Sequence, residues 1–213
     1  MCVSFYLTAL IAETLQFTCI TAPEVTEGPY YIGNEYVRND LREDQPGVTL
    51  ILDIGVIDTT TCQPFQNAFV DLWAGFYGGY QGGNVHKDTW LRGGEFTNNR
   101  GMVEITTIFP GFYVNRTAHV HVMVHKGSET RPNGTIISSS GATTHIGQFF
   151  FDESWNDQVY ATHPYNTNTQ GPHGGRPTSM QYLGKSLEDG LLGYITVAVD
   201  GSKNYTIQGK NAL

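Results

Sequence analysis

Residues 110–125 read PGFYVNRTAHVHVMVH, and this stretch decides how the chain folds. From residue 118 valines alternate with larger or polar side chains, which is the pattern of a β-strand, because successive side chains of a strand point to opposite faces. One face carries valines only, and we expect it in the core. The other face carries His119, His121, Met123 and His125.

The spacing of the histidines limits which of them can share a metal ion. Residues two apart on a strand lie roughly 6.6 Å apart, at about 3.3 Å per residue, so His119 and His121 can converge on one ion. His125 lies about 13 Å from His121 by the same rise, which is too far. A His-x-His pair alone is a weak signal, since a half-exposed strand face gives the same pattern.

Other parts of the chain show the same alternation. Residues 48–58, VTLILDIGVID, have apolar side chains at period two and predict a well-buried strand. Further strands are expected at residues 67–73, 102–109, 146–151, 194–200 and 204–208. These short strands, separated by Gly-rich turns, predict an all-β fold, a β-sandwich of mostly antiparallel strands with long loops and little helix. A short helix is expected from Asp152, and residues 162–184 are predicted to form a long loop without strand.

Composition narrows the classes of function. The chain has 213 residues, 39% of them hydrophobic, which suffices for one domain with a full core. The net charge is −8 and there is no basic stripe, so nucleic acid and anionic membranes are poor partners. The longest apolar run, residues 2–12, is too short to span a bilayer.

The N-terminus and the cysteines bear on location. Residues 1–22 are expected to be a remnant signal sequence or an arm that packs on the domain, and residues 23–213 a single domain. Of the three cysteines, Cys19 and Cys62 either form a disulfide in an extracellular protein or stay unpaired in a cytosolic one. We favour the extracellular alternative, which three glycosylation sequons permit without showing it; these begin at Asn115, Asn133 and Asn204.

Tyrosines near the histidine pair point to a particular metal. Tyr113 follows a Pro-Gly turn six residues before His119, Arg116 stands between them, and Tyr80 ends a Gly-Gly-Tyr segment after the strand that carries Trp73. Zinc and copper rarely recruit phenolates, whereas ferric iron does, because a hard trivalent cation favours anionic oxygen. Two tyrosinates and one hydroxide neutralise the three charges of Fe(III), and such a site binds an aromatic diol as a dianion.

With these motifs in view, the chain resembles the intradiol ring-cleavage dioxygenases, which include catechol 1,2-dioxygenases and protocatechuate 3,4-dioxygenases. It is most similar to the secreted, single-domain fungal-type branch. The resemblance runs from about residue 23 to about residue 165, and the pattern P-G-x-Y followed by R-x-x-H-x-H is highly specific. The similar segments, in family order, are EVTEGPYY, VRNDLREDQPGV, TCQPFQNAFVDLW, WLRG, TTIFPGFY, RTAHVHV and GQFFFD.

The resemblance implies one non-haem Fe(III) per chain and a set of roles. Tyr80, Tyr113, His119 and His121 would hold the iron, and Tyr113 would be the tyrosinate that leaves when substrate chelates. Arg116 would stabilise negative charge on the ring. The implied reaction is cleavage of a catechol-type diol by O2 between its hydroxyl-bearing carbons, giving a cis,cis-muconate-type diacid. Two further assignments complete the set: Gln148 lies beside the oxygen-reacting side of the substrate, and Tyr30 and Tyr31 line the mouth of the pocket.

The chain departs from the family pattern in places. WAGFYGGY is one residue shorter than usual between the strand Trp and the ligand Tyr, so Tyr77 competes with Tyr80; we favour Tyr80 because it keeps the Gly-x-Tyr ending. Ala74 stands where this branch usually has His. The helical N-terminal region with which bacterial catechol enzymes dimerise is missing, so we expect a monomer or a weak homo-oligomer.

Three alternatives stay open on the sequence. A zinc hydrolase could use His119 and His121 with His145 or His163 as a third ligand, although we expect both of these on surface loops. An inactive sandwich could keep a diol- or carbohydrate-binding cleft. A purely structural domain would leave the pattern of potential ligands unexplained.

Overall fold

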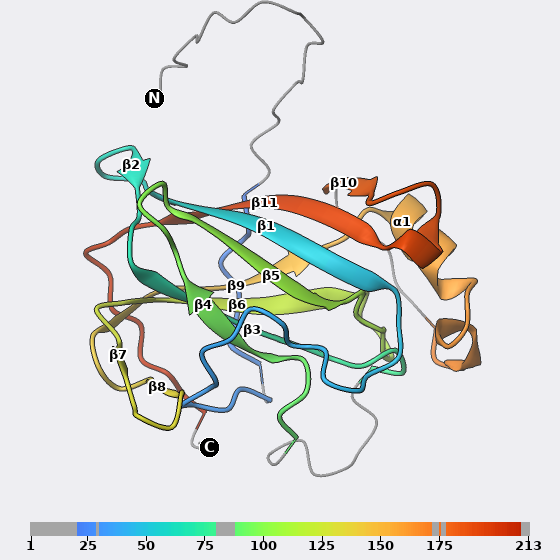
Figure 1. Ribbon diagram of the computed structural model, residues 1–213, viewed down its shortest axis with the longest axis horizontal. Coiled ribbons are helices and arrows are strands. Elements are labelled where there is room, and N and C mark those ends of the chain that lie inside the picture. The colour runs from blue at the N-terminus through green and yellow to red at the C-terminus, as the bar shows by residue number, and fades with distance from the viewer. Residues whose placement is uncertain (1–20, 29, 80–87, 172–174, 176–177, 210–213) are drawn as a thin grey trace, which may run out of the picture.

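Two facing β-sheets form the body of the molecule. The computed structural model describes residues 21–28, 30–79, 88–171, 175 and 178–209 (Figure 1). The first sheet has the order β10-β11-β1-β5, with β2 paired to the end of β1, and the second has the order β4-β3-β6-β9. All pairings within them are antiparallel except that of β1 with β11. The predicted all-β sandwich is confirmed.

The elements have the following bounds. In the first sheet they are β1 Thr49–Asp58, β2 Gln63–Pro64, β5 Met102–Ile108, β10 Ser179–Tyr182 and β11 Leu191–Val199. In the second they are β3 Ala68–Ala74, β4 Arg92–Phe96, β6 His119–Lys126 and β9 Ala142–Phe150. A small hairpin pairs β7 Glu129–Thr130 with β8 Ile136–Ile137, and the short helices are α1 Glu153–Tyr160, η1 Tyr165–Thr167 and η2 Leu187–Asp189.

The main core lies between the two sheets, where alternate side chains of β1 meet the valines of β6. Leu50, Leu52 and Ile54 are buried there, as the period-two pattern predicted. Helix α1 lies at one end of the sandwich and the β7–β8 hairpin at the other (Figure 1). Helix α1 begins where the sequence predicted, because the Asp152 side chain accepts a hydrogen bond from the backbone of Ser154 and caps its first turn.

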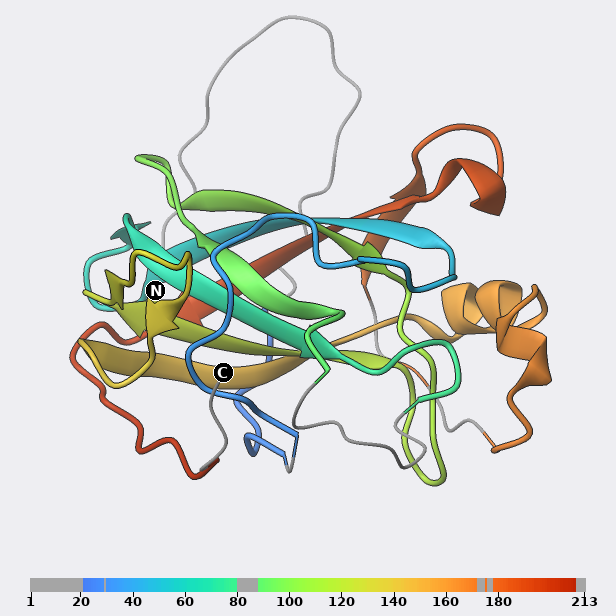
Figure 2. The ribbon, with the colours of Figure 1, turned by 60° about the horizontal axis from the view of Figure 1, so that its bottom comes forward.

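The second sheet is covered on its outer face as well. Residues 21–28 and 30–35, together with residues 200–209, run along this face (Figure 2). Their attachment includes hydrogen bonds from the backbone of Gln208 and Gly209 to the Glu27 carboxylate, both 2.7 Å. As a result, seven of the eight residues of β6 are buried, so the histidine face is not the half-exposed surface that an isolated motif suggests.

Three predictions about secondary structure need correction. Residues 204–208 form no strand; they are held instead by single bonds such as Tyr205 N–H to Thr143 O. The predicted loop of residues 162–184 contains β10, which pairs with β11. The Gly-rich strand β4 was not predicted: an added Cβ at Gly94 would lie 1.9 Å from the Val70 carbonyl, so the close pairing with β3 requires glycine.

The N-terminal predictions are tested only in part. Ala22 is buried in the core and donates its N–H to Thr196 O, so the chain belongs to the folded unit from residue 21 at the latest. Cys62 is exposed in the turn after β1, but Cys19 lies outside the described residues, so the disulfide and the extracellular location stay predictions. In the part of the chain that the structure describes, no helix is long and apolar enough to cross a membrane.

Tyr165 provides a test of how the loop after α1 is anchored. Its buried hydroxyl donates to Phe109 O (2.6 Å) and accepts from Val48 N–H (3.0 Å). Tyr165→Phe leaves both backbone groups without this partner, and we expect it to lower the free energy of unfolding by about 2–3 kcal/mol in urea titrations. The control is Tyr194→Phe, since Tyr194 is 38% exposed and we expect a change below about 0.5 kcal/mol. Equal losses in both variants would contradict the anchoring role.

Candidate metal centre

His121 occupies the middle of a row of side chains that crosses the second sheet. The strand register places Trp73 of β3 and Gln148 of β9 directly opposite it, and Arg92 of β4 opposite Trp73. The indole of Trp73 stacks on the imidazole, with ring centroids 4.8 Å apart and planes 8° apart. Gly28 lies so close to the Cε1 edge of the ring that an added Cβ would be 2.8 Å from that atom. The ring is therefore fixed by packing on one face and on this edge, and its burial lowers its pKa well below the usual value.

His119 presents one ring nitrogen to the site in a defined protonation state. Its Nδ1 lies 2.8 Å from the carbonyl oxygen of Thr117, which can only accept, so Nδ1 carries the proton and Nε2 keeps a lone pair. Burial lowers the pKa of His119 to about 4, so the ring is neutral near pH 7. A neutral imidazole with a lone pair on Nε2 is the form that binds a metal.

Tyr113 faces this nitrogen from the loop before β6. Its hydroxyl lies 3.3 Å from His119 Nε2, and the rings of His119 and His121 have centroids 4.9 Å apart. Burial raises the pKa of the phenol, while the positive charge of Arg116 opposes that shift. Ligand atoms at about 2 Å from one ion lie roughly 3 Å apart, so the separation of phenol oxygen and imidazole nitrogen fits a shared metal.

Arg116 and Gln148 lie beside these three side chains. The Arg116 N–H donates to Tyr113 O (2.8 Å) in a tight turn, and its guanidinium lies 5.8 Å from the Tyr113 ring centroid. Arg116 Nη2 donates to Gln148 Oε1 (2.8 Å), and Gln148 Nε2 lies 3.4 Å from His121 Nδ1. The structure thus brings together five of the predicted site residues, Tyr113, Arg116, His119, His121 and Gln148, around one point of the sheet.

The predicted second tyrosinate, Tyr80, lies outside the described residues. The described chain before it ends at Gly79, where an added Cβ would lie 3.2 Å from Tyr113 Cβ, so this loop rests directly on the loop of Tyr113. Tyr77, the competing ligand, packs its ring against the main core and edge-on to Phe76 at 5.1 Å. These contacts, within the part of the chain that is described, disfavour Tyr77 and leave Tyr80 as our prediction.

Tyr30 and Tyr31, predicted together, have different surroundings. Tyr30 is half-buried, its carbonyl accepts from Arg92 Nη1 (2.6 Å), and it is close enough to Tyr113 to contribute to the raised pKa of that phenol. Tyr31 is only 1% exposed, and its ring packs on Trp73 with centroids 4.9 Å apart. This position does not suit a residue at the mouth of a pocket, so Tyr31 is better described as support for the stacked indole.

Behind Trp73 lies a buried polar cluster that sequence reasoning missed. Tyr31 donates to Asp71 Oδ2 (3.1 Å), which lies 3.5 Å from His125 Nε2, and Arg92 pairs with Glu35 at 3.8 Å. Burial and the charge of Asp71 raise the pKa of Glu35, while Arg92 opposes the shift. His125 is therefore paired with Asp71 and is not placed at the metal site, as its spacing predicted. The sequence signal that could have revealed this cluster is the alternation of side chains in β3, which places Asp71 on the same face as Trp73.

The other histidines that the structure describes do not complete a zinc site. His145 is fully buried, which contradicts the expected surface position, but the register sets it opposite Val124, on the face away from His121. His163 is exposed, as expected. Within the described residues, no group of three or more His, Cys, Asp or Glu side chains could hold a metal ion. The donor set present, two neutral imidazoles and a phenol beside a guanidinium, suits ferric iron better than zinc.

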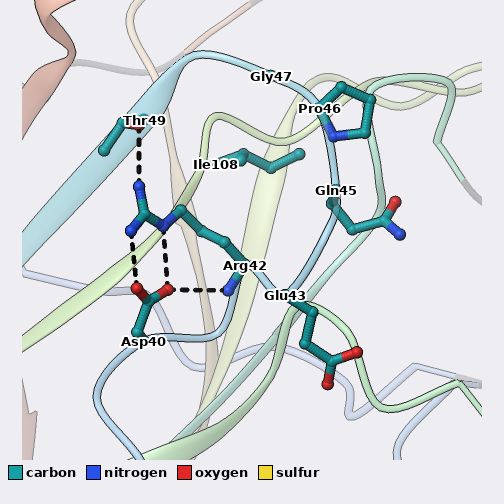
Figure 3. Close-up of a pocket in the computed structure, with 8 residues that line it drawn as sticks. All are labelled: Asp40, Arg42, Glu43, Gln45, Pro46, Gly47, Thr49 and Ile108. Carbon is teal, nitrogen blue, oxygen red and sulfur yellow. Dashed lines mark hydrogen bonds and ion pairs between the residues drawn. The ribbon is translucent and has the colours of Figure 1, made fainter.

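A surface hollow elsewhere on the molecule lacks such chemistry. It has a volume of about 440 Å³ and is lined by residues of the 40–49 segment and Ile108 (Figure 3). The Arg42 guanidinium there is bound by both carboxylate oxygens of Asp40 and lies 3.3 Å from Thr49 Oγ1. Its charge is already neutralised by a neighbour, and none of the predicted site residues lines the hollow.

Comparison with known proteins identifies the family. A family model described as "Dioxygenase" matches residues 20–174, a span that includes the whole candidate site. An intradiol ring-cleavage dioxygenase from Tetranychus urticae is 28% identical, with a TM-score of 0.72, over 88% of this chain and 98% of that one. The chain belongs to the intradiol ring-cleavage dioxygenases.

More distant members of the family share the fold. The dioxygenase domain of a carbohydrate-binding fusion protein from Streptomyces is 23% identical, with a TM-score of 0.57, over 84% of this chain and 98% of that one. Catechol 1,2-dioxygenase from Pseudomonas arvilla is 20% identical, with a TM-score of 0.57, over 90% of this chain and 67% of that one. A comparison with curated protein sequences gave no match.

Gly28 tests whether packing against His121 matters to the site. Gly28 has φ 81° and Gly134 has φ 82°, but an added Cβ at Gly134 has nothing within 4 Å. Both alanine variants carry the same left-handed backbone cost of about 1–2 kcal/mol. We expect Gly28→Ala to lose at least about 1 kcal/mol more than Gly134→Ala in urea titrations, and to bind less iron, because the new methyl displaces His121. Equal behaviour of the two variants would show that the contact is unimportant.

Proposed function

We propose that this family member catalyses Fe(III)-dependent intradiol cleavage of a catechol-type aromatic diol by O2, with both oxygen atoms incorporated into a cis,cis-muconate-type diacid. The observation that carries the proposal is the grouping of the Tyr113 hydroxyl with His119 Nε2, beside the Arg116–Gln148 pair. Family membership supports the same reaction class. A mere binding module has no evident use for a desolvated phenol–imidazole pair next to a guanidinium.

The residues that would hold iron are Tyr113, His119 and His121, with Tyr80 as the proposed fourth ligand. Ferric iron bound there would supply Lewis-acid chemistry that makes a catecholate reactive toward O2. His119 would bind it without a proton to displace, since burial keeps the ring neutral and the Thr117 carbonyl holds the remaining proton on Nδ1. Burial keeps His121 neutral as well. Their orientation is set in advance, by the Thr117 carbonyl for one ring and by the Trp73 stack for the other.

Tyr113 would act on the diol protons. It is half-buried at the edge of the site, whereas the two histidines are 4% and 2% exposed, so Tyr113 has more room to move than the other described ligands. As a tyrosinate that swings away from the site it would accept one proton of the incoming diol at its hydroxyl oxygen. Away from the metal, burial raises the pKa of the Tyr113 phenol, which favours its keeping that proton.

Arg116 and Gln148 would act on the bound ring. The guanidinium is held by Gln148 Oε1 at 2.8 Å, so its direction is fixed before substrate arrives. In a site shielded from water, a fixed positive charge stabilises negative charge that develops on the diolate ring. The preferred diol is left open by this geometry, and catechol is the simplest probe of it.

The first test is the visible spectrum of the protein after reconstitution with iron. We expect a broad tyrosinate-to-iron absorption band that shifts on addition of catechol and is lost or strongly altered in Tyr113→Phe and Tyr80→Phe. Tyr77→Phe is the matched control, because its ring packs on the core, and it should keep the band. Catechol turnover under ¹⁸O2 should label both new carboxyl groups. A colourless protein that takes up zinc and not iron would refute the proposal.

The second test concerns Arg116. Removing its charge in Arg116→Gln should lower kcat for catechol by about 100-fold, the usual effect of losing one donor to developing negative charge. Iron content should stay near that of the unmodified protein. The control is Arg42→Gln at the surface hollow, which should leave kcat unchanged. An Arg116 variant with undiminished kcat would remove Arg116 from the mechanism.

A further inference from the structure

A single side-chain amide joins the two loops that lead to the proposed tyrosine ligands. Gln170 Oε1 accepts from Val114 N–H (3.0 Å), and Gln170 Nε2 donates to Gly78 O (3.2 Å). Val114 follows Tyr113 directly, and Gly78 lies two residues before Tyr80 in the sequence. One amide therefore connects Gln170 to two loops that precede it by 56 and 92 residues in the sequence.

Asn168 secures the same connection from the other side of Tyr113. Its Nδ2 donates to Phe112 O (2.8 Å), and its Oδ1 accepts from Gln170 N–H (3.1 Å). The residues immediately before and after Tyr113 are thus both held by side chains of one short segment. That segment follows η1, whose buried Tyr165 is bonded to Phe109 and Val48 of the sandwich, so its base is fixed.

The side chains on the two sides of Tyr113 differ in burial. Phe112 is buried and its ring packs on Tyr160 with centroids 4.3 Å apart, whereas Val114 is 60% exposed and contributes little burial. One backbone hydrogen bond also joins this loop to the neighbouring one, from Gly111 N–H to Phe76 O (3.2 Å). An added Cβ at Gly111 would lie 2.1 Å from Tyr77 O, so no larger side chain can replace that contact.

We propose that Gln170 is a positioning residue that fixes the backbone just after Tyr113 and ties it to the loop of Gly78, while Asn168 fixes the backbone just before Tyr113. Because these hydrogen bonds hold the backbone, the phenol of Tyr113 moves by rotation of its own side chain. The loop then stays in place when substrate displaces the phenol. The inference rests on the proposed function, because it assigns the hydrogen bonds of Gln170 and Asn168 to the support of a metal-binding tyrosine. Among the described residues, the hydrogen bonds of the Gln170 side chain go to backbone atoms and not to a proposed ligand atom, so Gln170 is not a catalytic residue.

The test compares Gln170→Ala and Gln170→Glu with the control Gln66→Ala, whose amide bonds an exposed carbonyl of Asn99 away from the site. In the metal-free protein, hydrogen exchange at the Val114 amide should accelerate about fivefold in Gln170→Ala, the effect of one ordinary hydrogen bond. Gln170→Glu keeps the acceptor for Val114 but loses the donor to Gly78, so it should retain the protection of Val114. The unfolding midpoints of all three variants should stay close together.

Titration with ferric iron then tests whether the hydrogen bonds of Gln170 to Val114 and Gly78 affect the metal site. We expect Gln170→Ala to bind ferric iron about fivefold more weakly and to shift the tyrosinate absorption band, with Gln170→Glu intermediate and Gln66→Ala unchanged. Unaltered affinity and band in Gln170→Ala would overturn the positioning role, even if exchange accelerates. An unmodified protein that binds no ferric iron would instead overturn the proposed function, and the positioning role with it.

Discussion

The burial of β6 on both faces is the constraint on which the site depends. One face of valines closes the core between the sheets, and the opposite face holds two imidazoles in a nearly water-free layer. Desolvation keeps both rings neutral, and in His119 the proton held on Nδ1 by the Thr117 carbonyl leaves the Nε2 lone pair available at ordinary pH. The same burial would be costly without partners, and the partners supplied are the Thr117 carbonyl, the Gln148 amide and the Trp73 ring.

The outer cover of the second sheet makes that burial possible. Residues 21–35 and the C-terminal segment enclose the histidine face together with the ionisable groups Glu35, Asp71 and Arg92. Arg92 links this cluster to the site, because it pairs with Glu35 and also holds the Tyr30 carbonyl. Buried charges of this kind are expensive to separate, so the cluster favours one arrangement of the cover over others.

Rigid and movable parts of the site are supplied by different elements. Both histidines and Gln148 stand on paired strands, where register fixes their positions. Tyr113 and Arg116 stand outside the named strands, on a loop that turns through Asn115 at φ 64°. This division suits a reaction in which the histidines stay bound while one tyrosine is displaced. It also explains why a loop far along the chain, at Asn168 and Gln170, contacts the backbone around Tyr113.

The sequence by itself determined the features that follow from local periodicity. Alternation in β6 set His119 and His121 on one face, and the rise along the strand excluded His125. The sequence also located the start of α1 at Asp152, because these features depend on neighbours within a few residues. Only the tertiary structure decided which polar residues are buried. Tyr31 and His145 were expected near the surface and lie inside, since distant segments cover them. Strand β4 and the Gln170 contacts could not be predicted from the sequence either. A Gly-rich strand and a bridging amide are recognised only by the partners that the folded chain brings beside them.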